Sequence, residues 1–167
     1  VFCSLGRLEK VKRYDLLIQA FEKFIENDKS SCLIIAGYDF GQKKILLNKI
    51  KSFNNIFLVG HLEEEEKKIL LRNSNFFILT SDYESFSIST IESLASAVPV
   101  IISENIPWQD VEENQCGLVT KNDISSIVNA LERSKFVNFK PESCLNYVKS
   151  RFDWKIIANN FCKTFLS

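Results

Sequence analysis

The chain has 167 residues, of which 46% are hydrophobic, and its 21 basic side chains balance its 21 acidic ones. This length is enough for one domain with a substantial core, and the apolar content excludes intrinsic disorder. Because neither sign of charge dominates, neither nucleic acid nor an anionic membrane is expected as the main partner.

Cysteine and histidine are used sparingly. The five cysteines are scattered, odd in number and without a C-x-x-C pair, which favours a reducing, cytoplasmic compartment. The single histidine, His61, does not make a zinc site, and no apolar run reaches the length of a membrane span. The sequence opens at Val1 in an apolar run and contains no methionine. We therefore expect it to be an excised domain or a processed product rather than a whole gene product.

Short apolar runs alternate with longer amphipathic runs along the chain. Nearly continuous apolar runs are typical of strands covered on both faces, and apolar repeats every three to four residues are typical of helices. The sequence predicts strands at 1–5, 31–36, 55–59, 75–79 and 98–103, with a short sixth strand at 117–119. It predicts helices at 14–27, 42–52, 63–73, 92–97, 122–134 and 141–166, the last broken near Phe152 and Asp153.

This alternation indicates βαβ units and an α/β fold. We expect a Rossmann-like, doubly wound parallel sheet of about six strands, with helices on both faces. Ligands of such sheets bind beyond the carboxyl ends of the strands. The loops of interest therefore follow Leu5, Ala36, Val59, Leu79 and Ser103.

The first of these loops, GRLEKVKRYD, is rich in cations. Gly6 allows a tight exit from the strand, and Arg7 and Lys12 follow with Lys10 and Arg13 beside them. Cations ahead of a helix N-terminus can hold a diphosphate. The alternative is a solvated basic loop without a ligand.

The second and third loops carry weaker signals. GYDFG (37–41) is not the G-x-G-x-x-G dinucleotide fingerprint, so its glycines indicate only a turn. In the third loop, His61 is better interpreted as a surface side chain than as a general base.

The fourth loop, SDYESFSISTIE, places two carboxylates around a serine-rich segment. Ser89 and Glu92 fit the S-x-x-E capping box of the following helix, and Ser81 and Glu84 fit it as well. Alternatively, the carboxylates bind vicinal hydroxyls, such as those of carbohydrates, while backbone N–H groups of residues 85–88 contact an anion.

Five motifs in order resemble the C-terminal domain of GT-B glycosyltransferases of family 4. They are GRLEKVKRYDLLIQAF, the E-x7-E segment ESFSISTIE, ESLASAVPVI, IPWQDVEENQCGLV and RFDWKIIANNF, and they span nearly the whole chain. The resemblance implies that residues 1–167 are the donor-binding half of a GT-B enzyme, whose N-terminal acceptor domain is absent. Four positions depart from the family pattern: Arg13, Ser85, Ser87 and Ala97 stand where glycine is usual.

The resemblance also implies roles for individual residues. Arg7 and Lys12 would hold the diphosphate of a nucleoside-diphosphate sugar, and Glu84 would act near the reacting centre as the catalytic carboxylate. Glu92 would bind the ribose, and the base would lie near Phe57 to Gly60. The remaining substrate-binding positions are Gly6, Ser85, Phe86, Ser87 and Ile88.

The resemblance implies transfer with retention of configuration, without a metal or cofactor. PWQDVEENQCG looks like segments of enzymes of bacterial surface polysaccharide or glycolipid synthesis, for which peripheral association with the inner face of the cytoplasmic membrane is one option. We expect the isolated domain to bind the donor without transferring sugar. Two other interpretations stay open: a non-catalytic nucleotide-binding module, and a structural domain whose carboxylates are only caps.

Overall fold

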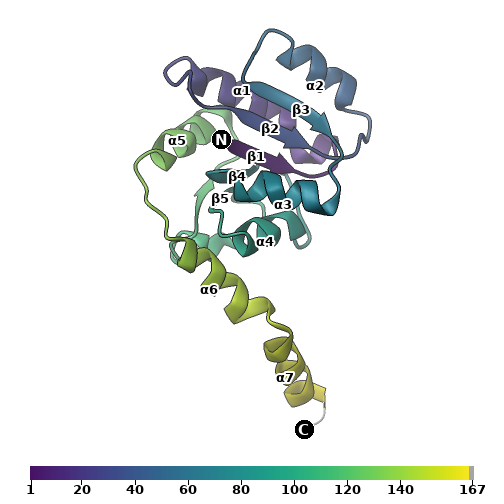
Figure 1. The fold of residues 1–167 in the computed structure, drawn as a ribbon, viewed down its shortest axis with the longest axis vertical. Coiled ribbons are helices and arrows are strands. Elements are labelled where there is room, and N and C mark those ends of the chain that lie inside the picture. Colours follow the sequence, from purple (N-terminus) through teal and green to yellow (C-terminus); the bar gives the residue numbers. More distant parts are fainter. Residues whose placement is uncertain (166–167) are drawn as a thin grey trace.

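Six short apolar segments form one parallel sheet in the computed structural model, which describes residues 1–165 (Figure 1). Along the sheet the strands follow the order β3-β2-β1-β4-β5-β6. Their bounds are β1 Phe2–Leu5, β2 Leu33–Ala36, β3 Ile56–Gly60, β4 Phe76–Leu79, β5 Val100–Ser103 and β6 Gly117–Thr120. The predicted six-stranded parallel sheet is therefore confirmed.

Helices connect the strands. Their bounds are α1 Tyr14–Ile25, α2 Lys43–Ile50, α3 Glu64–Arg72, α4 Ile88–Ala95, α5 Ile124–Ser134, α6 Pro141–Phe152 and α7 Trp154–Phe165. Two short 3-10 helices, η1 Lys10–Lys12 and η2 Gln109–Val111, lie in the loops after β1 and β5. The predicted interruption of the last helix is confirmed, because α6 ends at Phe152 and Asp153 has extended backbone angles.

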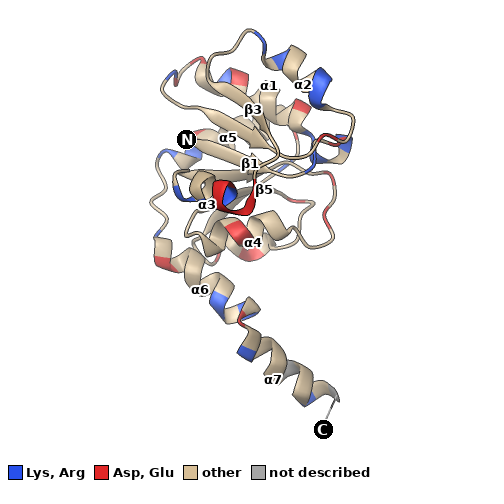
Figure 2. Ribbon diagram, turned by 45° about the vertical axis from the view of Figure 1, so that its right-hand side comes forward, with Lys and Arg blue, Asp and Glu red and all other residues tan. Residues whose placement is uncertain are grey.

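The sheet separates two apolar cores, as expected when each strand is buried on both faces. Successive residues of β1 point to opposite faces, so Phe2 packs in one core and Cys3 in the other. Helices α1, α2 and α5 cover the first core, and α3, α4 and α6 cover the second. Beyond α6, helix α7 leads away from the sheet, as Figures 1 and 2 both show.

The strand order positions the candidate site. From β1 the chain winds outwards through β2 to β3, and then returns to the other side of β1 to form β4, β5 and β6. The winding direction thus reverses between β1 and β4, where the two following loops must separate to opposite faces of the sheet. A crevice opens at such a point, and it is the usual ligand site of doubly wound sheets.

The start of α4 differs from the prediction. The helix begins at Ile88 rather than at 92, so Ser89 and Glu92 lie inside it, and the predicted capping box of these two residues is wrong. Ser81 and Glu84 lie in the loop before α4 and do not flank the start of a helix, although the Ser81 hydroxyl donates a hydrogen bond to the Glu84 carboxylate. A true capping box forms at α3, where Glu63 and Glu66 bond reciprocally. The sequence pattern S-x-x-E is short and cannot show where the backbone becomes helical.

Helix α4 ends in a strained conformation. Ala97, which follows the helix, has a φ of 62°, in the left-handed region that usually takes glycine at a helix C-terminus. A Cβ atom in this conformation costs roughly 1–2 kcal/mol. The strained residue lies where the chain turns from α4 towards β5.

We expect Ala97→Gly to stabilise the domain by about 0.5–1 kcal/mol, since the relieved strain exceeds the added backbone entropy of the unfolded chain. Ala95→Gly is the matched control, because Ala95 is an exposed residue of the same helix with right-handed geometry. It should lower stability. Urea unfolding of both variants measures the difference, and equal changes in the two would contradict the prediction.

Candidate functional site

A cavity of about 640 Å³ lies at the carboxyl edge of the sheet. The loops after β1, β2, β3 and β4 and the first part of α4 surround it. Nine of the residues singled out in the sequence line it: Gly6, Arg7, Lys12, Glu84, Ser85, Phe86, Ser87, Ile88 and Glu92. The structure therefore brings together residues that the sequence separates by up to 86 positions (92 − 6).

Two expected residues lie apart from this cavity. Phe57 is in the edge strand β3 with 44% of its surface exposed, and it does not line the cavity. Gly60 does not line it either, and its carbonyl oxygen accepts a hydrogen bond of 2.7 Å from the N–H of Gly37. The segment that follows Gly60 does reach the cavity, through His61 and Leu62.

The first loop folds closely over the cavity because two glycines leave room. A Cβ atom on Gly37 would lie 1.8 Å from the carbonyl oxygen of Gly6, so the loops after β1 and β2 touch backbone to backbone. A Cβ on Gly6 would lie 2.9 Å from the hydroxyl of Tyr14 and 3.4 Å from Nζ of Lys12. The glycine of GYDFG that seemed to mark only a turn therefore permits a close contact.

The two cations of the first loop differ in freedom. Lys12 ends η1, and its side chain is only 11% exposed. Arg7 is 58% exposed, pairs with Glu9 at 2.9 Å and lies over the ring of Phe40. The interpretation of this loop as a solvated segment holds for Arg7 but is wrong for Lys12.

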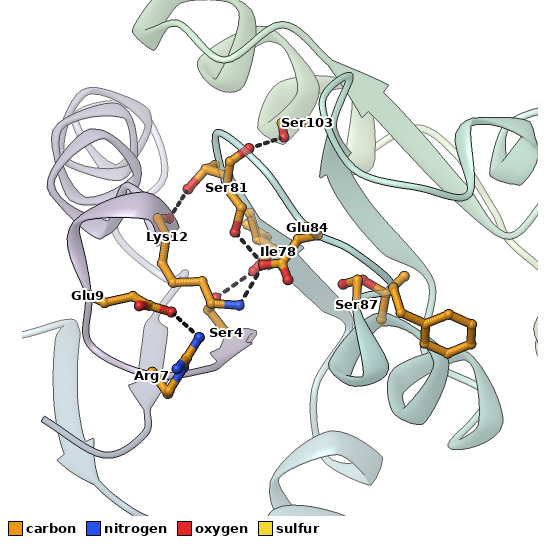
Figure 3. Close-up of polar contacts among 12 residues, drawn as sticks. Ser4, Arg7, Glu9, Lys12, Ile78, Ser81, Glu84, Ser87 and Ser103 are labelled. Atoms are coloured by element: carbon orange, nitrogen blue, oxygen red, sulfur yellow. Dashed lines mark hydrogen bonds and ion pairs between the residues drawn. The ribbon is translucent and has the colours of Figure 1, made fainter. Parts of the chain in front are cut away.

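Lys12 and Glu84 form the central contact of the site. Nζ of Lys12 lies 2.5 Å from Oε1 of Glu84, whose side chain is 13% exposed, and the Ser81 hydroxyl donates to the same oxygen at 2.7 Å. Figure 3 shows both groups converging on the Glu84 carboxylate. The Ser103 hydroxyl in turn donates to the carbonyl oxygen of Ser81 at 2.7 Å. The loops after β1 and β4 thus hold the carboxylate through Lys12 and Ser81, and strand β5 supports Ser81 through Ser103.

Both contacts use one oxygen of the Glu84 carboxylate. Within residues 1–165, Glu84 accepts no hydrogen bond through its second carboxylate oxygen, Oε2. This oxygen remains an acceptor for a ligand hydroxyl. A carboxylate fixed by one oxygen and open at the other is suited to bind a polyol in a defined orientation.

The second carboxylate, Glu92, is held in a similar way from a different helix. Nζ of Lys67 in α3 lies 2.6 Å from Oε1 of Glu92 and 2.9 Å from Oε2 of Glu64. Burial by itself would lower the pKa of Lys67, but hydrogen bonds to the two carboxylates outweigh it and raise the pKa above its usual value. Lys67 therefore stays charged at neutral pH and fixes the orientation of Glu92.

Several cavity residues were missed in the sequence. Lys67 and Glu64 lie in the helix predicted at 63–73, to which no site role was assigned, and Tyr38 follows β2 without a motif. His61 stacks on Tyr38 with ring centroids 3.6 Å apart. The common signal was position, because these residues lie near the carboxyl ends of β2 and β3 or in the next helix.

The backbone at the start of α4 is shaped for a ligand. Ser87 has a φ of 63° and its hydroxyl is hydrogen-bonded to that of Thr90 at 2.7 Å, so its side chain does not cap the helix. The N–H groups of Ile88 and Ser89 in the first helical turn have no intrahelical acceptor, whereas Thr90 donates to the carbonyl oxygen of Ser87, and residues 85–89 line the cavity. Such N–H groups attract anions and hydroxyl oxygens.

Residues 1–165 contain neither a metal-binding cluster nor a membrane-spanning helix. No group of three or more His, Cys, Asp or Glu side chains there is arranged to hold a metal ion. No helix in that part of the chain has the length and hydrophobicity needed to cross a membrane.

Comparison with known proteins identifies the family. The model of the glycosyl transferases group 1 matches residues 1–143. The chain belongs to this family. The resemblance seen in the motifs is thereby confirmed, and so is the fold class of this glycosyltransferase domain.

Individual relatives are distant in sequence and similar in fold. The alpha-1,3/1,6-mannosyltransferase ALG2 of Dictyostelium discoideum is 27% identical over 152 residues, which cover 79% of this chain and 36% of that protein. Anabaena Alr3699/HepE, solved with UDP and glucose, superposes with a TM-score of 0.81 at 19% identity, covering 99% of this chain and 48% of its own. The C-terminal domain of LpcC from Francisella tularensis gives a TM-score of 0.79 at 18% identity, with coverages of 92% and 86%.

The family member described here spans only part of its relatives. It covers about a third of the length of the mannosyltransferase and about half of the Anabaena protein. It covers most of the solved C-terminal domain of LpcC.

We expect Lys12→Ala to destabilise this domain by about 1–3 kcal/mol, because it leaves the partly buried Glu84 carboxylate without its cation. Lys10→Ala is the matched control, since Lys10 lies in the same 3-10 helix with its side chain exposed. It should change stability by less than about 0.5 kcal/mol. Chemical unfolding measures both.

The double variant Lys12→Ala/Glu84→Gln tests the cause of this loss. A neutral amide tolerates the site better than an unpaired carboxylate, so part of the stability should return. If the double variant is less stable than Lys12→Ala alone, the two side chains do not form the proposed pair.

Proposed function

We propose that this chain is the donor-binding domain of a glycosyltransferase and that it binds a nucleoside-diphosphate sugar. The observation that carries the proposal is the shared cavity of Arg7, Lys12, Glu84 and Glu92 at the reversal point of the sheet. Two cations for a diphosphate, one carboxylate for a sugar and another for a ribose match three of the four parts of such a donor, the fourth being the base. The family membership of the chain supports the same assignment.

In this proposal Lys12 serves two groups at once. An ammonium has three donors, so Lys12 can keep its contact with Glu84 and still donate to a phosphate oxygen. Arg7, which is exposed, would rotate from Glu9 towards the diphosphate. Their charges would stabilise the diphosphate as its bond to the sugar breaks, so we propose that no metal or other cofactor is required.

Glu84 is the proposed catalytic carboxylate. Its second oxygen, Oε2, would accept a hydrogen bond from a hydroxyl of the donor sugar. Its negative charge would stabilise the positive charge that develops at the anomeric carbon. The C1–O bond to the diphosphate breaks, and the electron pair leaves with the diphosphate. The acceptor oxygen forms the new bond to C1, and its proton passes to the leaving phosphate oxygen.

The remaining parts of the assignment rest on the family resemblance. We propose that the configuration at the anomeric carbon is retained, and that a second domain, outside residues 1–167, binds the acceptor. We also propose a cytoplasmic location and an acceptor from bacterial surface polysaccharide or glycolipid synthesis, reached by peripheral association with the membrane. An E. coli relative 26% identical over 92% of this chain is named as a galactosyltransferase acting on a GlcNAc-diphosphoundecaprenol, which supports this choice.

The chain should bind a nucleoside diphosphate without transferring sugar. Calorimetry with UDP, GDP and ADP measures binding, and hydrolysis or transfer of the corresponding sugar nucleotides measures turnover. Arg7→Ala and Lys12→Ala should each weaken the best ligand by about 1.5–3 kcal/mol, the range for hydrogen bonds to charged groups. Lys10→Ala should leave its affinity unchanged.

Three results would count against this proposal. Binding of none of the three nucleotides would show that the cavity is not a nucleotide site. Equal affinity of the wild type and Lys12→Ala for the nucleotide would show that Lys12 of the first loop does not bind the diphosphate. Robust transfer by the chain alone would contradict the need for a second domain.

The two carboxylates should separate in a second experiment. Glu92→Gln should lower the preference for a nucleoside diphosphate over its deoxyribose analogue, because the amide loses the charge that binds the ribose hydroxyls. Glu84→Gln should leave that preference intact and weaken the sugar nucleotide relative to the bare diphosphate. If Glu84→Gln weakens both ligands equally and Glu92→Gln weakens neither, the assigned roles are wrong.

A further inference from the structure

Three aromatic rings join the wall of the cavity to the end of α6. Phe86, which lines the cavity, packs edge-to-face against Trp108 at 5.0 Å and against Phe152 at 5.7 Å. Trp108 and Phe152 pack against each other at 5.1 Å with their planes perpendicular. These mutual edge-to-face contacts are the preferred geometry of aromatic pairs. The three rings form a closed cluster of residues that are far apart in the sequence.

Trp108 also holds the backbone of the cavity loop. Its indole N–H donates to the carbonyl oxygen of Phe86 at 2.6 Å. The next residue, Ser87, has left-handed backbone angles, and α4 starts directly after it. The indole therefore fixes the loop at Phe86, the residue before the left-handed Ser87. A small displacement of Phe86 would change the direction of the first N–H groups of α4.

The third ring belongs to the junction between two helices. Phe152 is the last residue of α6, and α7 begins two residues later at Trp154. The same end of α6 is tied to the segment of Trp108, because Arg151 and Tyr147 both bond to the carboxylate of Asp110. The hydroxyl of Tyr147 donates to this carboxylate at 2.6 Å. The cluster thus has a rigid support on the α6 side.

We infer that Trp108 is a positioning residue that couples the loop of residues 85–88 to the junction of α6 and α7. Through Phe152, the orientation of this junction determines how the loop presents its N–H groups to the cavity. Coupling between two sites is reciprocal, so a ligand that orders the loop also orders the junction. Helix α7 follows this junction and leads away from the sheet (Figure 1).

Hydrogen exchange of the ligand-free chain tests the coupling directly. Trp108→Phe keeps a ring but removes the donor to Phe86, so exchange of amides in residues 85–89 should rise about fivefold, the ratio for one lost hydrogen bond. Phe152→Ala removes the ring on the far side and should raise exchange of the same amides about two- to tenfold. Residues 43–50 of α2, on the opposite face of the sheet, should not change.

Trp154→Ala is the matched control for Phe152→Ala. Both are aromatic residues at the junction, but Trp154 is 81% exposed and outside the cluster. It should leave exchange of residues 85–89 unchanged. If Phe152→Ala and Trp108→Phe both leave these amides as in the wild type, or if exchange rises equally throughout the chain, the coupling is refuted.

A second arm uses the ligand and rests on the proposed function. The probe is whichever of UDP, GDP and ADP binds best to the wild type. At saturation it should protect residues 150–154, which do not line the cavity, and this protection should be lost in Trp108→Phe. Protection of 85–89 without protection of 150–154 would overturn the inference. If none of the three nucleotides binds, the proposed function fails, while the ligand-free arm still decides the coupling.

Discussion

The ion pair of Lys12 and Glu84 is the interaction on which the site depends. It joins the loop after β1 to the loop after β4 across the point where the winding of the sheet reverses. The two loops diverge because they lead to helices on opposite faces of the sheet. A short contact between opposite charges, nearly shielded from water, sets the width of the crevice between them. In the proposed function this pair fixes one cation in the cavity, while the exposed Arg7 would turn from Glu9 towards the diphosphate.

Three of the five non-glycine residues with left-handed backbone angles in the described part of the chain stand where the family usually has glycine. Arg13, Ser87 and Ala97, each where the family usually has glycine, have φ angles of 50°, 63° and 62°. At these three positions the backbone adopts the region that glycine favours, although a side chain is present. Local contacts compensate at two of the positions: Arg13 is hydrogen-bonded to both carboxylate oxygens of Asp82, and Ser87 to Thr90. At Ala97 only a backbone bond from its N–H to the carbonyl of Leu94 is formed, which is why that position is the one to relax with glycine.

The two carboxylates of the E-x7-E motif share one construction. Each is held through Oε1 by a lysine from another element, Glu84 by Lys12 and Glu92 by Lys67. A lone carboxylate at a cavity wall would repel a diphosphate, whereas a carboxylate paired in this way carries little net charge and still presents an oxygen. In the proposed function, this pairing would allow an acidic sugar site to accept an anionic ligand. The aromatic cluster around Trp108 adds a mechanical support to the loop between the two carboxylates.

The sequence alone predicted the strands and helices of this domain and nine of the residues that line its cavity. Continuous apolar runs such as FFIL and LIIA predict buried parallel strands, because only such strands are covered on both faces, and the E-x7-E and GRL motifs are compact enough to be recognised in one segment. Helix starts were less certain, since S-x-x-E occurs whether or not the backbone is helical at that point. What only the tertiary structure decided is which distant side chains meet: Lys12 with Glu84, Lys67 with Glu92, and Phe86 with Trp108 and Phe152. These contacts follow from the strand order, which places loops far apart in the sequence at one edge of the sheet, and the periodicity of a single segment contains no information about its neighbours in space.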